Sequence, residues 1–340
     1  MRFRKDRFIA KSTSSIRDLL QSSCSFFNED NPINPWLDNG LISIEGRTVT
    51  SSQEIVHPGN VIILKTPESW EPPVNKEYKI IFQDKHILAV DKPAPLPVHR
   101  TGKYWFHTLS QCLVDDGFLD DHNIHPTHRL DRETSGIVLF AKDKQSASSI
   151  QQQFQDRTVH KEYIAICHGV PGKRESSITF PLIKRDTGNI RNVMTVSDNG
   201  LRAITRYNTH LVNNTKSYSL LTLVPETGRR HQLRAHLFAL GHPIVGDKLY
   251  GPYRQSYGRF VRLQEESEKE ILEKLGSSRQ LLHCRSITIT HPNTLEKMTF
   301  TCNIPADMNN FCHTHSIREP EIICNNHSTR EIRHRTPKNF

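Results

Sequence analysis

The chain has 340 residues and a mass of 39.2 kDa, and 35% of its residues are hydrophobic, so it can bury a sizeable core and suits two domains better than one. Its 45 Lys and Arg residues exceed its 36 Asp and Glu residues, and the net charge of +9 makes a polyanion the first partner to consider. No stretch approaches the roughly 20 consecutive apolar residues of a membrane span, which argues against a transmembrane protein.

Cysteine usage and the first residues bear on the compartment. The seven cysteines are scattered and odd in number, so we expect no disulfide framework and a reducing, cytoplasmic location. Residues 1–21 lack the apolar segment of a secretory signal, but their basic, Ser-rich composition leaves an organellar transit peptide open.

Residues 36–65 predict a small module of strands and tight turns. In chain order the strands and turns fall at 41–44, 45–47, 48–49, 57–60 and 61–64. Three prolines between 67 and 75 cannot donate ladder hydrogen bonds and predict an extended linker. The predicted organisation is an N-terminal region at 1–66, a Pro-rich linker at 67–77, a larger domain at 78–308 and a polar tail at 309–340.

Beyond the linker, short β-type runs outnumber helical patterns. The predicted strands lie at 78–82, 87–90, 136–141, 162–167, 218–224, 287–290 and 298–301. Apolar spacing predicts helices at 144–154 and 231–240, and a segment dense in Glu and Lys predicts a solvated helix at 263–275. Because strands and helices do not alternate strictly, we predict an α+β fold with a mixed, largely antiparallel sheet.

After Asp307 the composition changes to Asn, His, Arg and Thr with little hydrophobic periodicity, which predicts disorder over 309–340. One pattern in this tail, formed by Cys312, His315, Cys324 and His327, has donor types that zinc prefers. Such spacings arise by chance in a His-rich protein, so we expect no metal there.

The densest unusual stretch, HRLDRETSGIVLFAK at 128–142, places Asp131 between Arg129 and Arg132 and ahead of an apolar strand. A carboxylate at such a loop-to-strand junction can face a cleft. Nearby guanidinium charge favours the ionised form, which suits a nucleophile or a general base rather than a proton donor. The residues alone leave open that Asp131 only bridges the two arginines structurally.

A second stretch, TGRRHQLRAH at 227–236, clusters Arg229, Arg230 and Arg234 around the start of a predicted helix. The unpaired backbone N–H groups of a helix start attract anions, so this stretch predicts phosphate binding. His231 and His236 are five positions apart and do not share a helix face, which argues against metal-based catalysis.

A third stretch, HKEYIAICHG at 160–169, predicts a strand whose alternation places Lys161, Tyr163 and Ala165 on one face. Tyr163 could stack on a base or hydrogen-bond through its hydroxyl. A plain core tyrosine is the alternative interpretation.

Together these stretches resemble the RluA-type pseudouridine synthases. Residues 128–142 are similar to the family's signature around its catalytic aspartate, 161–169 to its Lys-x-Tyr-x-Ala strand, and 228–251 to its Gly-Arg-x-His-Gln-Leu-Arg-x-His and Gly-His-Pro-Ile-x-Gly-Asp blocks. DKPA at 91–94 with PVH at 97–99 resembles the opening motif of the catalytic domain, and 281–307 its closing strands. The later half of 36–64 is similar to the small RNA-binding module that often precedes this domain.

The resemblance implies isomerisation of uridine in RNA to pseudouridine, in which the uracil is cut from its sugar, rotated and rejoined through carbon, without cofactor or metal. It implies that Asp131 is the essential catalytic carboxylate, Tyr163 the aromatic beside the base, and Arg234 the basic partner of the carboxylate. A base whose glycosidic bond is broken must leave the stack, and a flat aromatic with a fixed anion makes a suitable pocket. Residues 97–109 look more like the branch that includes tRNA-modifying members, which favours tRNA over ribosomal RNA.

We expect basic residues to contact the RNA backbone and to make its affinity salt-dependent. The candidates are Arg129, Arg132, Arg157, Lys161, Arg229 and Arg230. Two other functions remain open, a non-catalytic RNA-binding protein on the same scaffold and a hydrolase that releases free uracil. No heptad repeat or other association signal stands out, so we expect a monomer.

Overall fold

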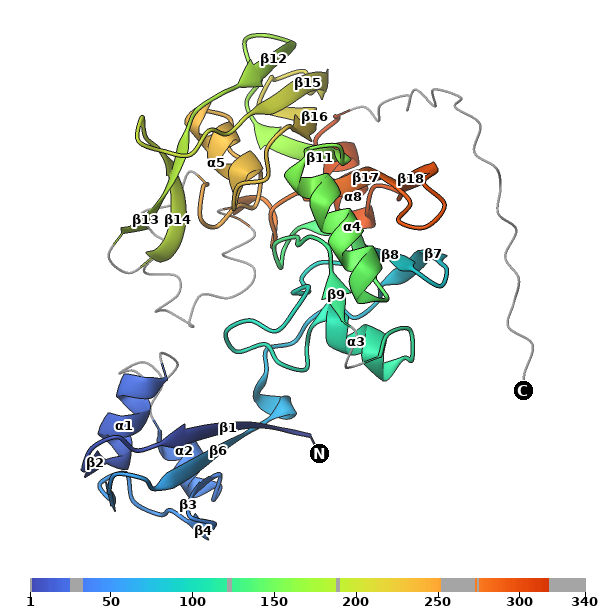
Figure 1. Cartoon of the computed structure of the whole chain (residues 1–340). Coiled ribbons are helices and arrows are strands. Elements are labelled where there is room, and N and C mark those ends of the chain that lie inside the picture. Colours follow the sequence, from blue (N-terminus) through green and yellow to red (C-terminus); the bar gives the residue numbers. More distant parts are fainter. Residues whose placement is uncertain are drawn as a thin grey trace.

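The computed structural model of the chain describes residues 2–24, 33–120, 124–187, 190–251, 273 and 275–317. Figure 1 shows a small N-terminal module, drawn in blue, and a larger domain that runs from cyan to red. Each of these two parts has a hydrophobic core of its own.

The N-terminal module is a four-stranded antiparallel sheet with two short helices. Its elements are β1 (Phe3–Ile9), β2 (Ser14–Ser15), α1 (Ile16–Ser23), α2 (Asn34–Asp38), β3 (Ile42–Ile44), β4 (Arg47–Thr48), β5 (Ile55–Val56) and β6 (Val61–Pro67). The sheet order is β1-β6-β3-β4, and the Ser15 hydroxyl caps α1 by accepting the Asp18 N–H at 3.1 Å. Ile16 and Leu20 of α1 are fully buried in this core. The strands predicted at 41–44 and 61–64 are present as β3 and β6.

The larger domain is built on one ten-stranded sheet in the described part of the chain. Its strands are β7 (Lys79–Gln83), β8 (Ile87–Lys92), β9 (His125–Pro126), β10 (Ser135–Ala141), β11 (His160–His168), β12 (Glu175–Ile178), β15 (Thr205–Val212), β16 (Tyr218–Pro225), β17 (Leu282–Thr290) and β18 (Lys297–Thr301). The main path is β12-β15-β16-β11-β17-β10-β8-β7, and β10 with β17 is the parallel pair in an otherwise antiparallel arrangement. The predicted α+β class with a mixed, largely antiparallel sheet is confirmed.

Helices and a small hairpin accompany this sheet. They are η1 (Glu68–Trp70), α3 (Leu109–Asp115), α4 (Lys144–Gln155), β13 (Leu182–Thr187), β14 (Ile190–Val196), α5 (Gln232–Ala239) and α8 (Ala306–Thr314). The helices predicted at 144–154 and 231–240 are present as α4 and α5. Helix α5 contacts β14, and Figure 1 shows it beside the β13–β14 hairpin. The helix predicted at 263–275 falls almost entirely outside the described residues.

The Pro-rich linker is more firmly held than its composition indicated. Residues 68–70 form the η1 turn, and the carboxylate of the buried Glu71 accepts N–H bonds from Trp105, Phe106 and His107 at 2.8–3.0 Å. Backbone N–H donors to a carboxylate are charge-assisted bonds, so they attach the linker to the larger domain.

The boundary of the predicted tail needs correction, because ordered chain continues beyond 308. Helix α8 buries Met308, Phe311 and Cys312, and Ile317 joins the same core cluster. The apolar residues of this short helix are too few to give a recognisable helical period among the polar residues around them. The remainder of the tail, with Cys324 and His327, lies outside the described residues.

Gly136, near the start of β10, has no room for a side chain. Its φ of +109° is a conformation that L side chains rarely adopt, and an added Cβ would lie 2.2 Å from the Cys284 carbonyl oxygen on the parallel strand β17. Gly136→Ala should therefore lower the free energy of unfolding by about 2–4 kcal/mol. Urea unfolding measures this loss. Gly172→Ala is the matched control, because no atom lies within 4 Å of its added Cβ; equal stability of the two variants would contradict the constraint.

Candidate active site

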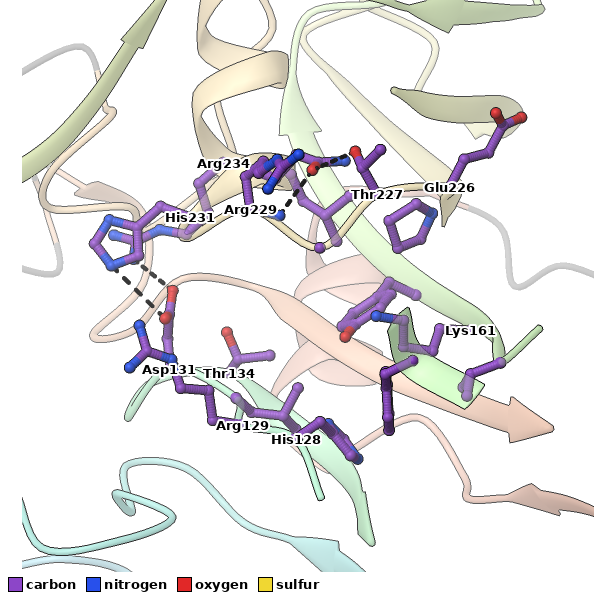
Figure 2. Close-up of a pocket in the computed structure, with 18 of the residues that line it drawn as sticks. His128, Arg129, Asp131, Thr134, Lys161, Glu226, Thr227, Arg229, His231 and Arg234 are labelled. Atoms are coloured by element: carbon purple, nitrogen blue, oxygen red, sulfur yellow. Dashed lines mark hydrogen bonds and ion pairs between the residues drawn. The ribbon is translucent and has the colours of Figure 1, made fainter. Parts of the chain in front are cut away.

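A cavity of about 520 Å³ opens beside the residues that precede β10. Its walls come from the loop at 128–134, called here the Asp131 loop, from the end of α4, from β11 and from the segment that joins β16 to α5. Figure 2 shows side chains from these elements pointing toward one another across the cavity. Seven of the nine residues singled out from the sequence line it: Arg129, Asp131, Arg157, Lys161, Tyr163, Arg229 and Arg234. Arg132 and Arg230 lie outside the described lining.

Asp131 contacts a guanidinium that is already held by another carboxylate. Arg234 donates from Nη1 to Asp131 Oδ2 at 2.7 Å, and from Nε and Nη2 to the two oxygens of Asp247 at 2.7 and 2.9 Å. The Asp247 side chain is fully buried and also accepts the N–H groups of Leu249 and Tyr250. Because Asp247 binds the guanidinium through two parallel hydrogen bonds, the remaining N–H edge is aimed at Asp131. The Asp131 side chain remains 30% exposed toward the cavity.

This contact sets the charge state of Asp131. Burial opposes the charged form, but the Arg234 guanidinium outweighs burial and holds the pKa of Asp131 at about 2. The carboxylate is therefore ionised at neutral pH, as the sequence predicts. The local pattern attributed this effect to the flanking arginines, whereas the stabilising charge comes from Arg234, 103 residues along the chain. Arg234 is the residue that the family resemblance implied as the partner of Asp131.

Neither flanking arginine forms an ion pair with Asp131 among the described residues. Arg132 donates from Nη1 to the Tyr104 hydroxyl at 2.5 Å and from Nη2 to Glu133 at 2.8 Å. Arg129 is exposed at the cavity wall. The interpretation of Asp131 as a bridge between Arg129 and Arg132 does not describe the structure.

Buried polar groups hold the Asp131 loop in place. The ammonium of the fully buried Lys92 donates to the carbonyls of Leu96 and Arg132 at 2.8 and 3.4 Å, and burial lowers the pKa of Lys92 to about 7. From the other side, Gln280 Nε2 donates to the Thr134 hydroxyl at 2.7 Å. In the sequence, Lys92 stands out only as part of an opening motif, since nothing local shows which carbonyls its ammonium reaches.

His231 is a site residue that the sequence analysis considered only as a metal ligand. It caps α5 with a φ of 49°, and its Nε2 lies 3.7 Å from Asp131 Oδ1 while Nδ1 lies 3.1 Å from the Tyr250 hydroxyl. Burial lowers the pKa of His231 to about 4, so the imidazole is neutral at pH 7. The neutral His231 imidazole is therefore a polar neighbour of the Asp131 carboxylate that carries no charge of its own.

The opposite wall is formed by β11. Tyr163 and Ala165 belong to the main core cluster, whereas Ile164 packs into the cluster on the other side, so the predicted strand alternation is present. Tyr163 is 7% exposed and lines the cavity, and burial raises its pKa well above the usual value, so its hydroxyl stays protonated. Tyr163 therefore combines core packing with a place in the cavity wall.

Cations also line the cavity. Lys161 Nζ lies 5.3 Å from the centre of the Phe154 ring, and no carboxylate of the described residues forms an ion pair with it. Burial lowers the pKa of Lys161. Arg157 is exposed after α4, and Arg229 is positioned by its backbone N–H donating to Gln232 Oε1 at 3.0 Å. An anionic group and several cations along one cavity suit a neutral ring that is attached to phosphates.

The described residues contain neither a metal-binding cluster nor a membrane-spanning helix. No group of three or more His, Cys, Asp and Glu side chains is arranged to hold a metal ion. None of the described helices is long and apolar enough to cross a membrane.

Comparisons with known proteins identify the family. Residues 86–239 match the family described as RNA pseudouridylate synthase. The chain is 35% identical over 236 residues to tRNA pseudouridine synthase C of Haemophilus ducreyi, covering 66% of this chain and 90% of that protein. It is 36% identical over 239 residues to the dual-specificity RNA pseudouridine synthase RluA of the same organism, covering 68% and 95%.

A solved structure agrees with these sequence relatives. Human RNA Pseudouridylate Synthase Domain Containing 4 matches with a TM-score of 0.53 and 30% identity, covering 71% of this chain and 94% of that one. The matched family residues include the Asp131 loop, β11 and α5, which form the cavity. The chain belongs to the RluA-type family of RNA pseudouridine synthases, and it is an isomerase that acts on uridine in RNA.

Proposed function

We propose that this enzyme isomerises specific uridines of structured RNA, with tRNA preferred over ribosomal RNA, and that Asp131 is its essential catalytic carboxylate. The observation that carries the proposal is the ionised Asp131, held by Arg234 and partly exposed in a cavity of about 520 Å³. A cavity of this size is in the range of small-ligand pockets and has room for an extruded nucleotide. The preference for tRNA is supported by a relative named for tRNA and another named for dual specificity.

The site residues have distinct roles in this proposal. An extruded uridine enters the cavity and lies beside the Tyr163 ring, near the Asp131 carboxylate. As an anion, Asp131 acts as a nucleophile or a general base, and Arg234 keeps it ionised and oriented. The cavity walls keep the detached uracil near the sugar, which rejoining through carbon requires.

Basic residues would hold the RNA backbone around this cavity. Arg129, Arg157, Lys161 and Arg229 line it, which supports direct contact with phosphates near the target nucleotide. Arg230 is exposed outside the lining and is placed to contact more distant phosphates, whereas Arg132 already binds Tyr104 and Glu133.

The N-terminal module would supply further RNA contacts. Strand β1 exposes Lys5 and Arg7 on one face of its four-stranded sheet. These cations support the proposed RNA-binding role of the module through sequence-independent backbone contacts.

The first test measures tritium release from RNA labelled at C5 of uridine, because this carbon loses its hydrogen when it bonds to the ribose. Unmodified transcripts of a tRNA pool and of ribosomal RNA are compared. We expect faster tritium release from tRNA than from ribosomal RNA. In Asp131→Asn the rate of release should fall by roughly 1,000-fold or more, because the neutral amide cannot act as a nucleophile or base. RNA binding and the thermal midpoint should stay near those of the unaltered enzyme.

Asp198→Asn is the matched control, because Asp198 is exposed and outside the cavity lining. It should keep full activity. Turnover by Asp131→Asn at the unaltered rate would refute the essential aspartate. Free uracil among the products would indicate a hydrolase, and RNA binding without any release would indicate a non-catalytic binding protein.

The pH dependence tests the role of Arg234. With a pKa of about 2, Asp131 stays ionised from pH 5 to pH 8, so its titration should leave kcat/KM flat over this range. In Arg234→Gln the burial of Asp131 is no longer offset, so its pKa rises and kcat/KM should fall as the pH is lowered. Arg234→Lys, which retains a positive charge, should restore a flatter profile. Arg230→Gln is the control, and an acid-side loss of equal size in this variant would contradict the assignment.

Lys161 provides a test of phosphate or base contact inside the cavity. Lys161→Gln removes a cation that has no ion-pair partner among the described carboxylates, so KM for RNA should rise about 10-fold while kcat changes little. Steady-state tritium release measures both constants. Lys173→Gln changes the same charge at an exposed position outside the cavity and should leave KM unchanged. A fall in kcat alone would assign Lys161 to the chemical step instead.

A further inference from the structure

A second buried guanidinium contacts the Asp131 loop. Arg279 is 5% exposed, and its Nη1 donates to the carbonyl of Glu133, two residues after Asp131, at 3.1 Å. The same nitrogen donates to the carbonyl of Gln280 at 2.9 Å. Because Arg279 lies outside the described lining of the cavity, any effect that it has on the reaction must pass through the backbone of the loop.

The other edge of this guanidinium is held by helix α8. Nε and Nη2 of Arg279 donate to the two oxygens of Asp307, which lies in the first turn of α8, and the Nη2 bond is 2.9 Å long. Burial opposes the charged form of Asp307, but the hydrogen bonds from Arg279 outweigh it and lower the pKa of this carboxyl, so Asp307 is ionised at neutral pH. Two parallel bonds fix the plane of the guanidinium, which directs Nη1 at the Glu133 carbonyl.

Helix α8 is itself fixed by apolar packing. Met308 and Phe311 belong to the same core cluster as Ile164 and Ile166 of β11. These two β11 residues alternate with Tyr163, whose side chain belongs to the main core cluster and lines the cavity. The helix therefore packs on the side of β11 that faces away from the cavity, and its packing holds the Asp307 carboxylate at a defined place.

The segment around Arg279 also contacts the turn around Asp247, the carboxylate that binds the guanidinium of the active site. The Arg279 carbonyl packs so closely against Gly246 that an added Cβ there would lie 1.9 Å from its oxygen. Lys248 Nζ donates to the Ser278 carbonyl at 2.7 Å. Because Gly246 and Lys248 flank Asp247 in the sequence, one segment contacts both the Asp131 loop and the turn that holds its cationic partner.

We infer that Arg279 and Asp307 are positioning residues for the isomerisation, which hold the Asp131 loop in register with Arg234, so that helix α8 is needed for catalysis. This inference rests on the proposed role of Asp131, and it places two further residues in the site that lie beyond the matched family residues 86–239. Without Asp307 the Arg279 guanidinium is free to turn away from the Glu133 carbonyl, and the loop can shift relative to Arg234. A displacement of about 1 Å at a reacting group can cost roughly 100-fold in rate.

The test removes the carboxylate in Asp307→Ala and measures steady-state tritium release. The Asp307 side chain is 47% exposed, so the variant should fold. We expect kcat to fall about 10- to 100-fold and KM for RNA to stay within about 2-fold, because the side chains that line the cavity are unchanged. Arg279→Gln should lower kcat to a similar extent, and the double variant should lose no more, since Asp307 acts through Arg279. Asp307→Glu, which retains a carboxylate, should recover part of the lost kcat.

Asp84→Ala is the matched control. The Asp84 carboxylate also accepts bonds from a side chain and from the backbone, at 2.8 Å from His291 Nε2 and 2.7 Å from the Ile87 N–H, but it lies outside the described lining of the cavity. This variant should lower the thermal midpoint and leave kcat unchanged. Equal losses of kcat in Asp84→Ala and Asp307→Ala would overturn the inference, because they would report a general loss of stability. An unchanged kcat in Asp307→Ala, or a rise in KM alone, would overturn it as well.

Hydrogen exchange follows the loop without any turnover. The Thr134 N–H donates to the Asp131 carbonyl at 3.0 Å within the loop. This amide should exchange faster in Asp307→Ala than in the unaltered enzyme and at the unaltered rate in Asp84→Ala. Unchanged exchange in Asp307→Ala would contradict the inference. Failure of the proposed role of Asp131 would appear separately, as full turnover by Asp131→Asn, while the loop amide would still respond to Asp307→Ala.

Discussion

The active site depends on one buried guanidinium shared between two carboxylates. Arg234 binds Asp247 through two hydrogen bonds and presents its remaining N–H edge to Asp131. Burying three charges costs desolvation free energy that their mutual attraction need not recover, so such a cluster contributes little evident stability. Its chemical effect is clear, because Asp131 stays anionic at neutral pH while partly enclosed.

The surrounding fold restrains the same loop from several directions. The parallel pairing of β10 with β17 at Gly136 brings the strand backbones too close for a side chain, which fixes where the Asp131 loop ends. Lys92 and Gln280 hold the loop through its carbonyl and hydroxyl groups. A carboxylate that must act on one ring within a cavity needs such restraint, since small displacements of a reacting group cost much of its rate.

The cavity lining contains both an anion and cations. The anion of Asp131 lies beside Arg234, whereas Lys161 and Arg157 face the space where phosphates would lie. In the proposed function this arrangement separates two tasks, since the backbone contacts would provide affinity while the enclosed carboxylate would provide the chemistry.

The sequence by itself determined the features that depend on residues close together in the chain. Period-2 alternation placed Lys161 and Tyr163 on one face of β11, apolar spacing identified α4 and α5, and the motifs around Asp131 indicated the family before any contact was known. The tertiary structure decided which charges meet. The flanking arginines form no ion pair with Asp131 among the described residues, while Arg234 reaches it across 103 residues. The family resemblance implied Arg234 as the partner, but only the structure shows the contact and the second carboxylate, Asp247, that holds the guanidinium. Periodicity reports which side of an element is buried, but the partner of a buried charge depends on the path of the whole chain, which no local pattern contains.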